Sequence, residues 1–257
     1  MLQKKASNTL RNLVGAKPLQ AMAAVVAASA ISATPAYAGE GETEVFFLFN
    51  SGSGTIEFLP SPEGGVVFES DFQETAPSNE TINPGFDNRE NVPPEALMPA
   101  GAFLGVNILE SLFFWDGSAP ADPGAAFITV LGGEDGDAGP VDAVVDGSSG
   151  VFTPDYSTLQ LVLDQADADG DAHDHFDYII SNGETGAYGL VMSLTTDAAG
   201  FEDSIPFGIL INNGLSDADF EAGVEFFNAQ VVPLPAGVWL LLSGFGLLAA
   251  KTRRAKV

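Results

Sequence analysis

The chain has 257 residues, with 35 acidic and 9 basic side chains and no cysteine. Without thiols it has no disulfide, no cysteine nucleophile and no zinc–thiolate or iron–sulfur site. The hydrophobic fraction of 46% is high enough to build a core, which argues against a disordered chain despite the strong net charge.

The charges are segregated along the chain. Eight of the nine basic residues lie in the first 17 or the last seven positions, and every acidic residue lies between Glu40 and Glu225. Segment 39–230 has 35 acidic side chains and one basic side chain, Arg89, so its net charge is 1 − 35 = −34. Nucleic acid binds through Lys and Arg, so this composition excludes a nucleic-acid partner.

Residues 1–38 have the three parts of a signal peptide. A basic segment ends at Lys17, the uncharged stretch 21–33 follows, and Ala36-Tyr37-Ala38 is an A-x-A cleavage site. The alternative is a membrane anchor that stays attached, but the apolar stretch is short for a span. We expect signal peptidase to remove it after Ala38.

Segment 39–231 contains short β-prone runs separated by Gly, Pro, Asp and Asn. This pattern predicts one all-β domain, an antiparallel sandwich or jelly-roll-like fold of about ten strands. Stretch 71–99 is rich in proline and is expected to be a long loop. The expected strands are 44–49, 55–59, 65–69, 103–109, 112–115, 126–131, 141–145, 159–163, 175–180, 188–194 and 207–211.

One helix is expected, over 217–229. Ser216 is a suitable N-cap, with Asp219 in the capping-box position three residues later. Phe220, Val224 and Phe227 recur at helical spacing, so one face of the helix should pack on the sheets.

Both histidines of the chain lie in one acidic segment. On a strand, His173, His175 and Asp177 would point to one face while Phe176, Tyr178 and Ile180 enter the core. Two imidazoles at this spacing can converge on one ion, with Asp177 or another carboxylate such as Asp171 as a further ligand. Nitrogen and oxygen donors without sulfur favour Zn²⁺ or another divalent transition metal.

Two alternatives to a transition-metal site stay open. The segment can be a solvated strand face, or the preceding acidic loop can bind Ca²⁺. With Gly170 at position 6 of an EF-hand, positions 1 and 12 are Gln165 and Phe176, so only an irregular calcium loop is compatible. A second acidic loop, 133–137, is more typical of a charged hairpin tip. The cupin metal pattern fails, because it needs a glycine at Asp167.

The C-terminus has three parts. Val232-Pro233-Leu234-Pro235-Ala236 begins it, an uncharged run ends at Ala250, and a tail with four basic residues closes it. The 17 residues from Leu234 to Ala250 would be about 25 Å long as a helix, just enough to cross a bilayer core. By the positive-inside rule the tail stays in the cytoplasm, and the acidic middle faces outward. An ordinary tail anchor is the alternative.

This C-terminus, 232–257, resembles the PEP-CTERM sorting signal in its VPLPA variant. The resemblance implies anchoring in the inner membrane of a Gram-negative cell, followed by cleavage by an exosortase at or near the proline motif. Three central segments, beginning at Asn83, Trp115 and Gly186, are weakly similar to uncharacterised PEP-CTERM exported proteins, and no activity comes with that similarity.

The sequence therefore predicts an exported surface or extracellular-matrix protein without catalytic activity, in a biofilm or exopolysaccharide context as the resemblance implies. No Gly-x-Ser-x-Gly elbow occurs, and the two histidines share one segment, so a hydrolytic triad has no support. The alternatives are an exported protein that binds a divalent metal and a carbohydrate-binding β-sandwich.

Overall fold

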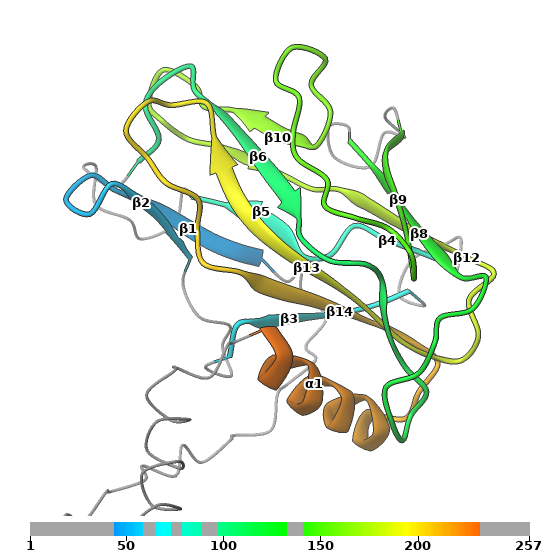
Figure 1. Cartoon of the computed structure of the whole chain (residues 1–257). Coiled ribbons are helices and arrows are strands. Elements are labelled where there is room, and N and C mark those ends of the chain that lie inside the picture. Colours follow the sequence, from blue (N-terminus) through cyan, green and yellow to red (C-terminus); the bar gives the residue numbers. More distant parts are fainter. Residues whose placement is uncertain (1–43, 59–64, 73–78, 89–96, 133–140, 232–257) are drawn as a thin grey trace, which may run out of the picture. The chain divides into compact units, whose positions relative to one another are not determined.

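The structure is a computed structural model that describes residues 44–58, 65–72, 79–88, 97–132 and 141–231 (Figure 1). These residues all lie in one compact unit of the chain. The expected signal peptide with Ala36 and Ala38, and the sorting segment 232–257, lie outside them. No helix in the described part of the chain is long and apolar enough to cross a membrane.

The described residues form fourteen strands and one helix, so the fold is mainly all-β as predicted. The elements are β1 (Glu44–Asn50), β2 (Thr55–Phe58), β3 (Val67–Asp71), β4 (Glu80–Thr81), β5 (Gly85–Asp87), β6 (Phe103–Ile108), β7 (Phe113–Trp115), β8 (Phe127–Leu131), β9 (Val141–Asp146), β10 (Val162–Gln165), β11 (His173–Asp174), β12 (Asp177–Ser181), β13 (Gly186–Thr196), β14 (Phe207–Asn213) and α1 (Asp217–Val231).

The strands form three sheets. The largest has the order β10-β6-β13-β14-β3, with β7 also paired to β13, and the two smaller ones have the orders β11-β5-β1-β2 and β4-β12-β8-β9. Most pairs are antiparallel, but β1 with β5 and β14 with β3 are parallel. The expectation of an antiparallel sheet was wrong at these two places, because each pair joins segments that long connections separate.

Strand β13 lies at the centre and is buried on both faces. Its residues Tyr188, Leu190, Met192 and Leu194 belong to the main core, which also takes side chains from the two smaller sheets. Ala187 and Val191 belong instead to a second cluster under α1. A strand covered on both sides reads as a continuous apolar run, and this is what its sequence has.

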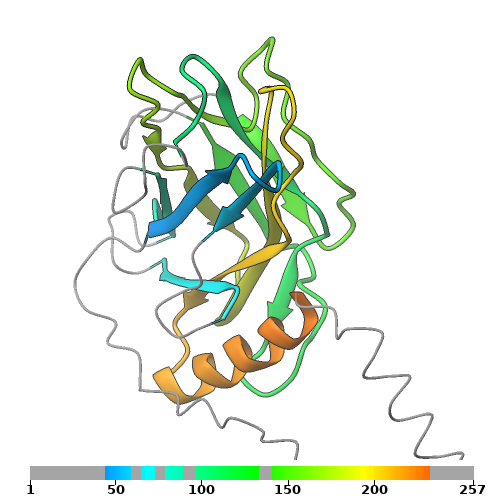
Figure 2. The same cartoon turned by 90° about the vertical axis from the view of Figure 1, so that its left-hand side faces the viewer.

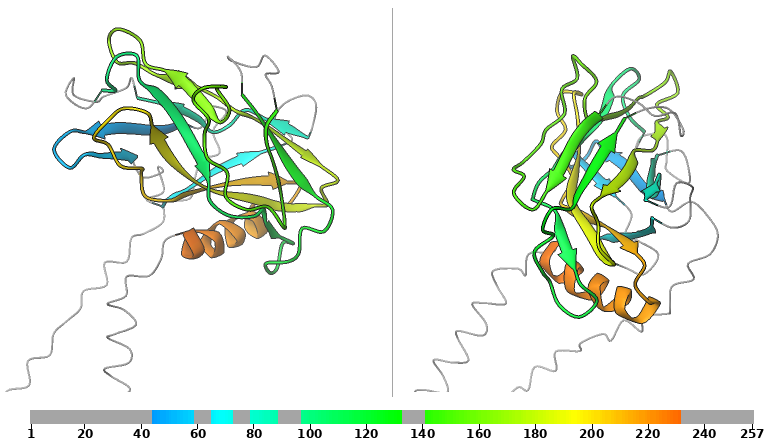
Figure 3. Two further views of the ribbon diagram at one scale, coloured as in Figure 1. Left: turned by 45° about the horizontal axis from the view of Figure 1, so that its top comes forward. Right: turned by 90° about the vertical axis from the view of Figure 1, so that its right-hand side faces the viewer.

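Helix α1 covers the outer side of the sheet that contains β14 and β3 (Figures 2 and 3). Its N-terminus is capped as predicted: Ser216 Oγ donates to Asp219 Oδ2 at 2.7 Å, and the Asp219 amide lies 3.4 Å from the same hydroxyl. Phe220 and Phe227 are buried against the sheet.

The stretch expected to be a loop, 71–99, contains two short strands, β4 and β5. The local sequence hides β5, because Asn83-Pro84-Gly85 is typical of a turn. This strand is central to the site, since it lies between β1 and β11 in the smaller sheet.

Candidate metal centre

The candidate site lies on one face of the β11-β5-β1-β2 sheet. Glu44 of β1 is opposite Gly85 of β5, and His173 of β11 is opposite Asp87 of β5. Residues directly opposite on adjacent strands point to the same face. Three chain segments that are far apart in the sequence therefore bring Glu44, His173 and the following His175 to one place.

Gly85 gives His175 its position. A β-carbon built on Gly85 would overlap the imidazole of His175, so the ring occupies the space that any other residue would fill. Because Gly85 lies on the strand between Glu44 and His175, its missing side chain lets the two side chains meet across it. A strand glycine of this kind marks a close approach of another group to the backbone.

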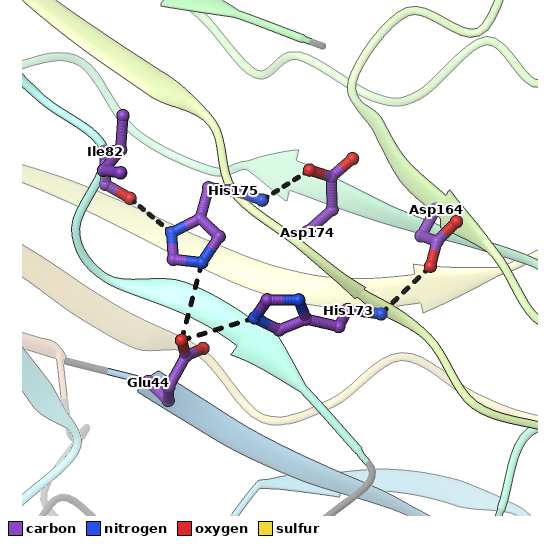
Figure 4. A network of polar contacts seen from close by, with 6 residues as sticks. All are labelled: Glu44, Ile82, Asp164, His173, Asp174 and His175. Atoms are coloured by element: carbon purple, nitrogen blue, oxygen red, sulfur yellow. Dashed lines mark hydrogen bonds and ion pairs between the residues drawn. The ribbon is translucent and has the colours of Figure 1, made fainter. Parts of the chain in front are cut away.

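The tautomer of His175 follows from its neighbours. Its Nδ1 lies 2.9 Å from the carbonyl oxygen of Ile82, which can only accept, so Nδ1 carries the proton (Figure 4). In the neutral ring Nε2 then has a lone pair directed away from the carbonyl. Metal-binding histidines are typically oriented in this way, with the second ring nitrogen donating to a carbonyl or carboxylate.

Glu44 meets both rings. Its Oε1 lies 3.4 Å from His173 Nε2 and 3.5 Å from His175 Nε2 (Figure 4). Its Oε2 is buried and has no hydrogen-bond partner. The side chain of His175 is 4% exposed and that of Glu44 is 13% exposed, so water screens the contact little.

The contact between Glu44 and His175 suits a shared cation. A carboxylate oxygen 3.5 Å from an imidazole nitrogen is stabilised by a positive charge, which either a proton on the ring or a metal ion between the two atoms supplies.

His173 completes the group. Its ring stands nearly perpendicular to that of His175, at 84° and with 5.1 Å between the centroids. Its backbone amide donates to Asp164 Oδ2 at 3.0 Å, which fixes the chain on the side away from Glu44. The side chain is 21% exposed, so it is the most accessible of the three donors.

One ligand atom from each of Glu44, His173 and His175 fits within 4.8 Å of the others, so this cluster can hold a metal ion. The sequence predicted the two histidines. It missed Glu44, which is 129 residues from His173 and opens a strand without any local signal of a ligand.

Asp177 and Asp171, the two predicted carboxylate ligands, are not in this group of three. The strand expected over 175–180 begins only at Asp177, because the chain leaves one sheet after Asp174 and enters another at β12. Phe176, Tyr178 and Ile180 are buried in the core as expected. Asp171 is half-buried just before β11, where it lines the same open hollow as His173.

Burial raises the pKa of Asp177, and nearby His175 partly offsets this effect. Asp177 in turn contributes to the raised pKa of Glu80, whose first cause is also burial. Asp177 is therefore near enough to His175 for an electrostatic interaction, although it is not one of the three donors.

The acidic loop before the histidines is a hydrogen-bonded turn. Oδ1 of Asp167 accepts the amides of Asp169 at 2.8 Å and Asp171 at 3.1 Å, and these bonds lower the pKa of Asp167. The loop borders an open hollow of about 250 Å³. Its lining residues are Asp164, Gln165, Asp167, Asp171, Ala172 and His173.

Comparisons of the chain with protein-family models, with curated proteins and with solved structures give no match.

Proposed function

We propose that this chain is an exported surface or matrix protein whose β domain binds one divalent transition-metal ion through Glu44, His173 and His175. The observation that carries the metal site is the convergence of three donor atoms, one each from Glu44, His173 and His175, within 4.8 Å of one another. The unpartnered Oε2 of Glu44 supports it, because an ion can take up that oxygen as well.

The two donor spacings that involve Glu44 fit a small tetrahedral ion. Zinc binds imidazole nitrogen at about 2.0–2.1 Å and carboxylate oxygen at about 2.0–2.2 Å, so two tetrahedral ligands lie about 3.3 Å apart. The two contacts of Glu44 Oε1 with the histidines measure 3.4 and 3.5 Å. Imidazole is a poor ligand for calcium, which prefers oxygen, so zinc or a similar transition metal is favoured at this site.

The ion is proposed to have a structural role. Two of its three donors are nearly inaccessible, and all three lie on or directly next to strands of one sheet. For the domain we propose a sandwich in which the six-stranded sheet faces the two smaller ones. The support is a single core cluster that combines Leu190 of β13, Phe47 of β1 and Ile128 of β8.

Export is proposed from the sequence. The A-x-A site at Ala36 and Ala38, the proline motif at 232–236 and the basic residues at both ends support a precursor held in the inner membrane and then processed by an exosortase. Transition metals enter such a protein from the medium outside the cytoplasm, where exopolysaccharide is a candidate partner.

Metal content tests the proposal. Protein purified from the exported fraction of cells that express the full chain is dialysed against buffered trace metals and measured by mass spectrometry. We expect about one equivalent of zinc or a related metal, and less than a tenth of that after Glu44→Gln. Glu57→Gln, an exposed glutamate of the neighbouring strand β2, is the matched control and should keep the full equivalent. Wild-type protein that retains no transition metal would contradict the proposal.

A further inference from the structure

The three donors come from the two outer strands of a narrow three-strand segment. Glu44 begins β1, His173 lies in β11 and His175 directly follows it, and β5 lies between these strands. Only three residue pairs join β1 to β5, and two join β11 to β5. Ladders this short hold few hydrogen bonds, so side-chain contacts must contribute much of the cohesion here.

We propose that the ion acts as a clamp, so that metal supply controls the local stability of this three-strand segment. The proposal rests on the proposed metal function and deepens it. A bound ion links β1 directly to β11 across Gly85, where no side chain of β5 intervenes. Opening the segment separates Glu44 from the histidines and destroys the site, so the ion binds only the closed form.

Without an ion, Glu44 gains when the segment opens. Its Oε2 is buried without a hydrogen-bond partner, and water can solvate this atom in the open form. The metal-free segment is then held together by its short ladders and opens more readily than the metal-bound segment.

The other end of the β1–β2 hairpin has its own attachment. Its turn is tied to Glu202, whose carbonyl accepts the Ile56 amide at 3.2 Å and whose amide donates to the Gly54 carbonyl at 2.7 Å. Phe49 also packs edge-on against Phe201, with 4.9 Å between the ring centroids. These contacts do not involve the donors, so the clamp should act on one end of the hairpin only.

An ion that binds only the closed form slows exchange through the open form. The protection factor of the affected amides is multiplied by one plus the ratio of the free ion concentration to Kd. At a free ion concentration of 100 Kd, amides that exchange through opening of the segment should therefore exchange up to about 100-fold more slowly. Amides whose exchange does not need this opening should keep their rates.

Hydrogen exchange with mass spectrometry tests this on the full exported protein, in chelator and in saturating zinc. We expect at least tenfold slower exchange in peptides that cover 44–46, 85–87 and 173–175, and less than twofold change at 54–56. Glu44→Gln should abolish the local slowing, and the matched control Glu57→Gln should retain it.

A calorimetric titration on the same samples distinguishes failure of the clamp from failure of the metal site. Zinc that binds with the same exchange rates in 44–46, 85–87 and 173–175 as in chelator overturns the clamp and leaves the metal site standing. Equal slowing at 54–56 also overturns it, because the effect would then be global. Absence of binding overturns the clamp together with the metal function.

Discussion

The imidazole of His175 lies over the α-carbon of Gly85, in the space where every other residue would carry its side chain. Gly85→Ala should therefore displace the ring and weaken zinc binding roughly 10–100-fold, the loss typical for groups that orient a ligand. Calorimetric titration measures the change. Gly150→Ala is the control, because a β-carbon there meets no atom within 4 Å and should leave the affinity unchanged. Unaltered binding by Gly85→Ala would show that the ion does not use His175 in this position.

Glu44→Gln should remove most of the gain in stability on zinc binding. The variant amide keeps the size of the side chain but loses the charged ligand oxygen, so the zinc affinity should fall more than about 100-fold, beyond the loss for outer-shell partners. Its melting temperature should therefore rise much less than that of the wild type between chelator and saturating zinc. Thermal melts in both buffers measure this. An equal rise in the two proteins would contradict Glu44 as a ligand.

Asp142 should make stability fall as the pH rises. It is 3% exposed, and burial raises its pKa although its Oδ2 accepts the Leu161 amide at 2.9 Å. Between the ordinary value of about 3.9 and the raised one, the unfolded chain has lost this proton and the folded chain has kept it. The wild type should thus lose free energy of unfolding relative to Asp142→Asn as the pH rises through this window.

Urea unfolding at a series of pH values measures the free energy of unfolding of the wild type and of Asp142→Asn. The contributions of the other acidic residues cancel in the difference between the two. Asp155→Asn provides a control of opposite sign. Hydrogen bonds from Ser157 hold the pKa of Asp155 below its ordinary value, so the wild type should gain stability relative to that variant as the pH rises. Two curves whose slopes have the same sign would contradict at least one of the two assignments.

The charge of segment 39–230 should make folding salt-dependent. With a net charge of 1 − 35 = −34, self-repulsion is strong at low salt and is screened as the Debye length falls from about 10 Å at 0.1 M to about 3 Å at 1 M. We expect the melting temperature in chelator to rise with sodium chloride. A melting temperature that stays flat over this range would show that the charges are too far apart to matter.

The proline motif should direct C-terminal processing. Replacing Pro233 and Pro235 by alanine lets a helix continue through the segment, which removes the extended backbone that a protease needs. Mass spectrometry of the exported fraction should show a shortened chain for the wild type and a retained basic tail for the variant. Pro120→Ala, at an exposed proline of the domain, should be processed normally. Equal processing of all three proteins would refute a role for the motif.

Local patterns predicted most of the fold, and long-range pairing accounts for what they missed. The β-prone run 44–49 predicted β1, and the capping residues predicted the start of α1. The three-residue strand β5 has too few residues to show a period, and it exists because β1 and β11 flank it.

The candidate site was likewise predicted only in part from the sequence. Both histidines could be found because they are the only two in the chain and lie two residues apart. The change of sheet after Asp174, which separates Asp177 from the donors, is a tertiary event that an ideal strand pattern does not contain. Glu44 was one of 35 acidic residues, and only the register between β1 and β5 distinguishes it.

X-ray absorption of the zinc-loaded exported protein is the most direct test of the proposed centre. It should show imidazole scattering from two histidines and first-shell nitrogen and oxygen at about 2.0–2.2 Å, and Glu44→Gln should change the oxygen contribution. A first shell of oxygen alone, without imidazole scattering, would place the ion on the acidic surface and contradict a site built from Glu44, His173 and His175.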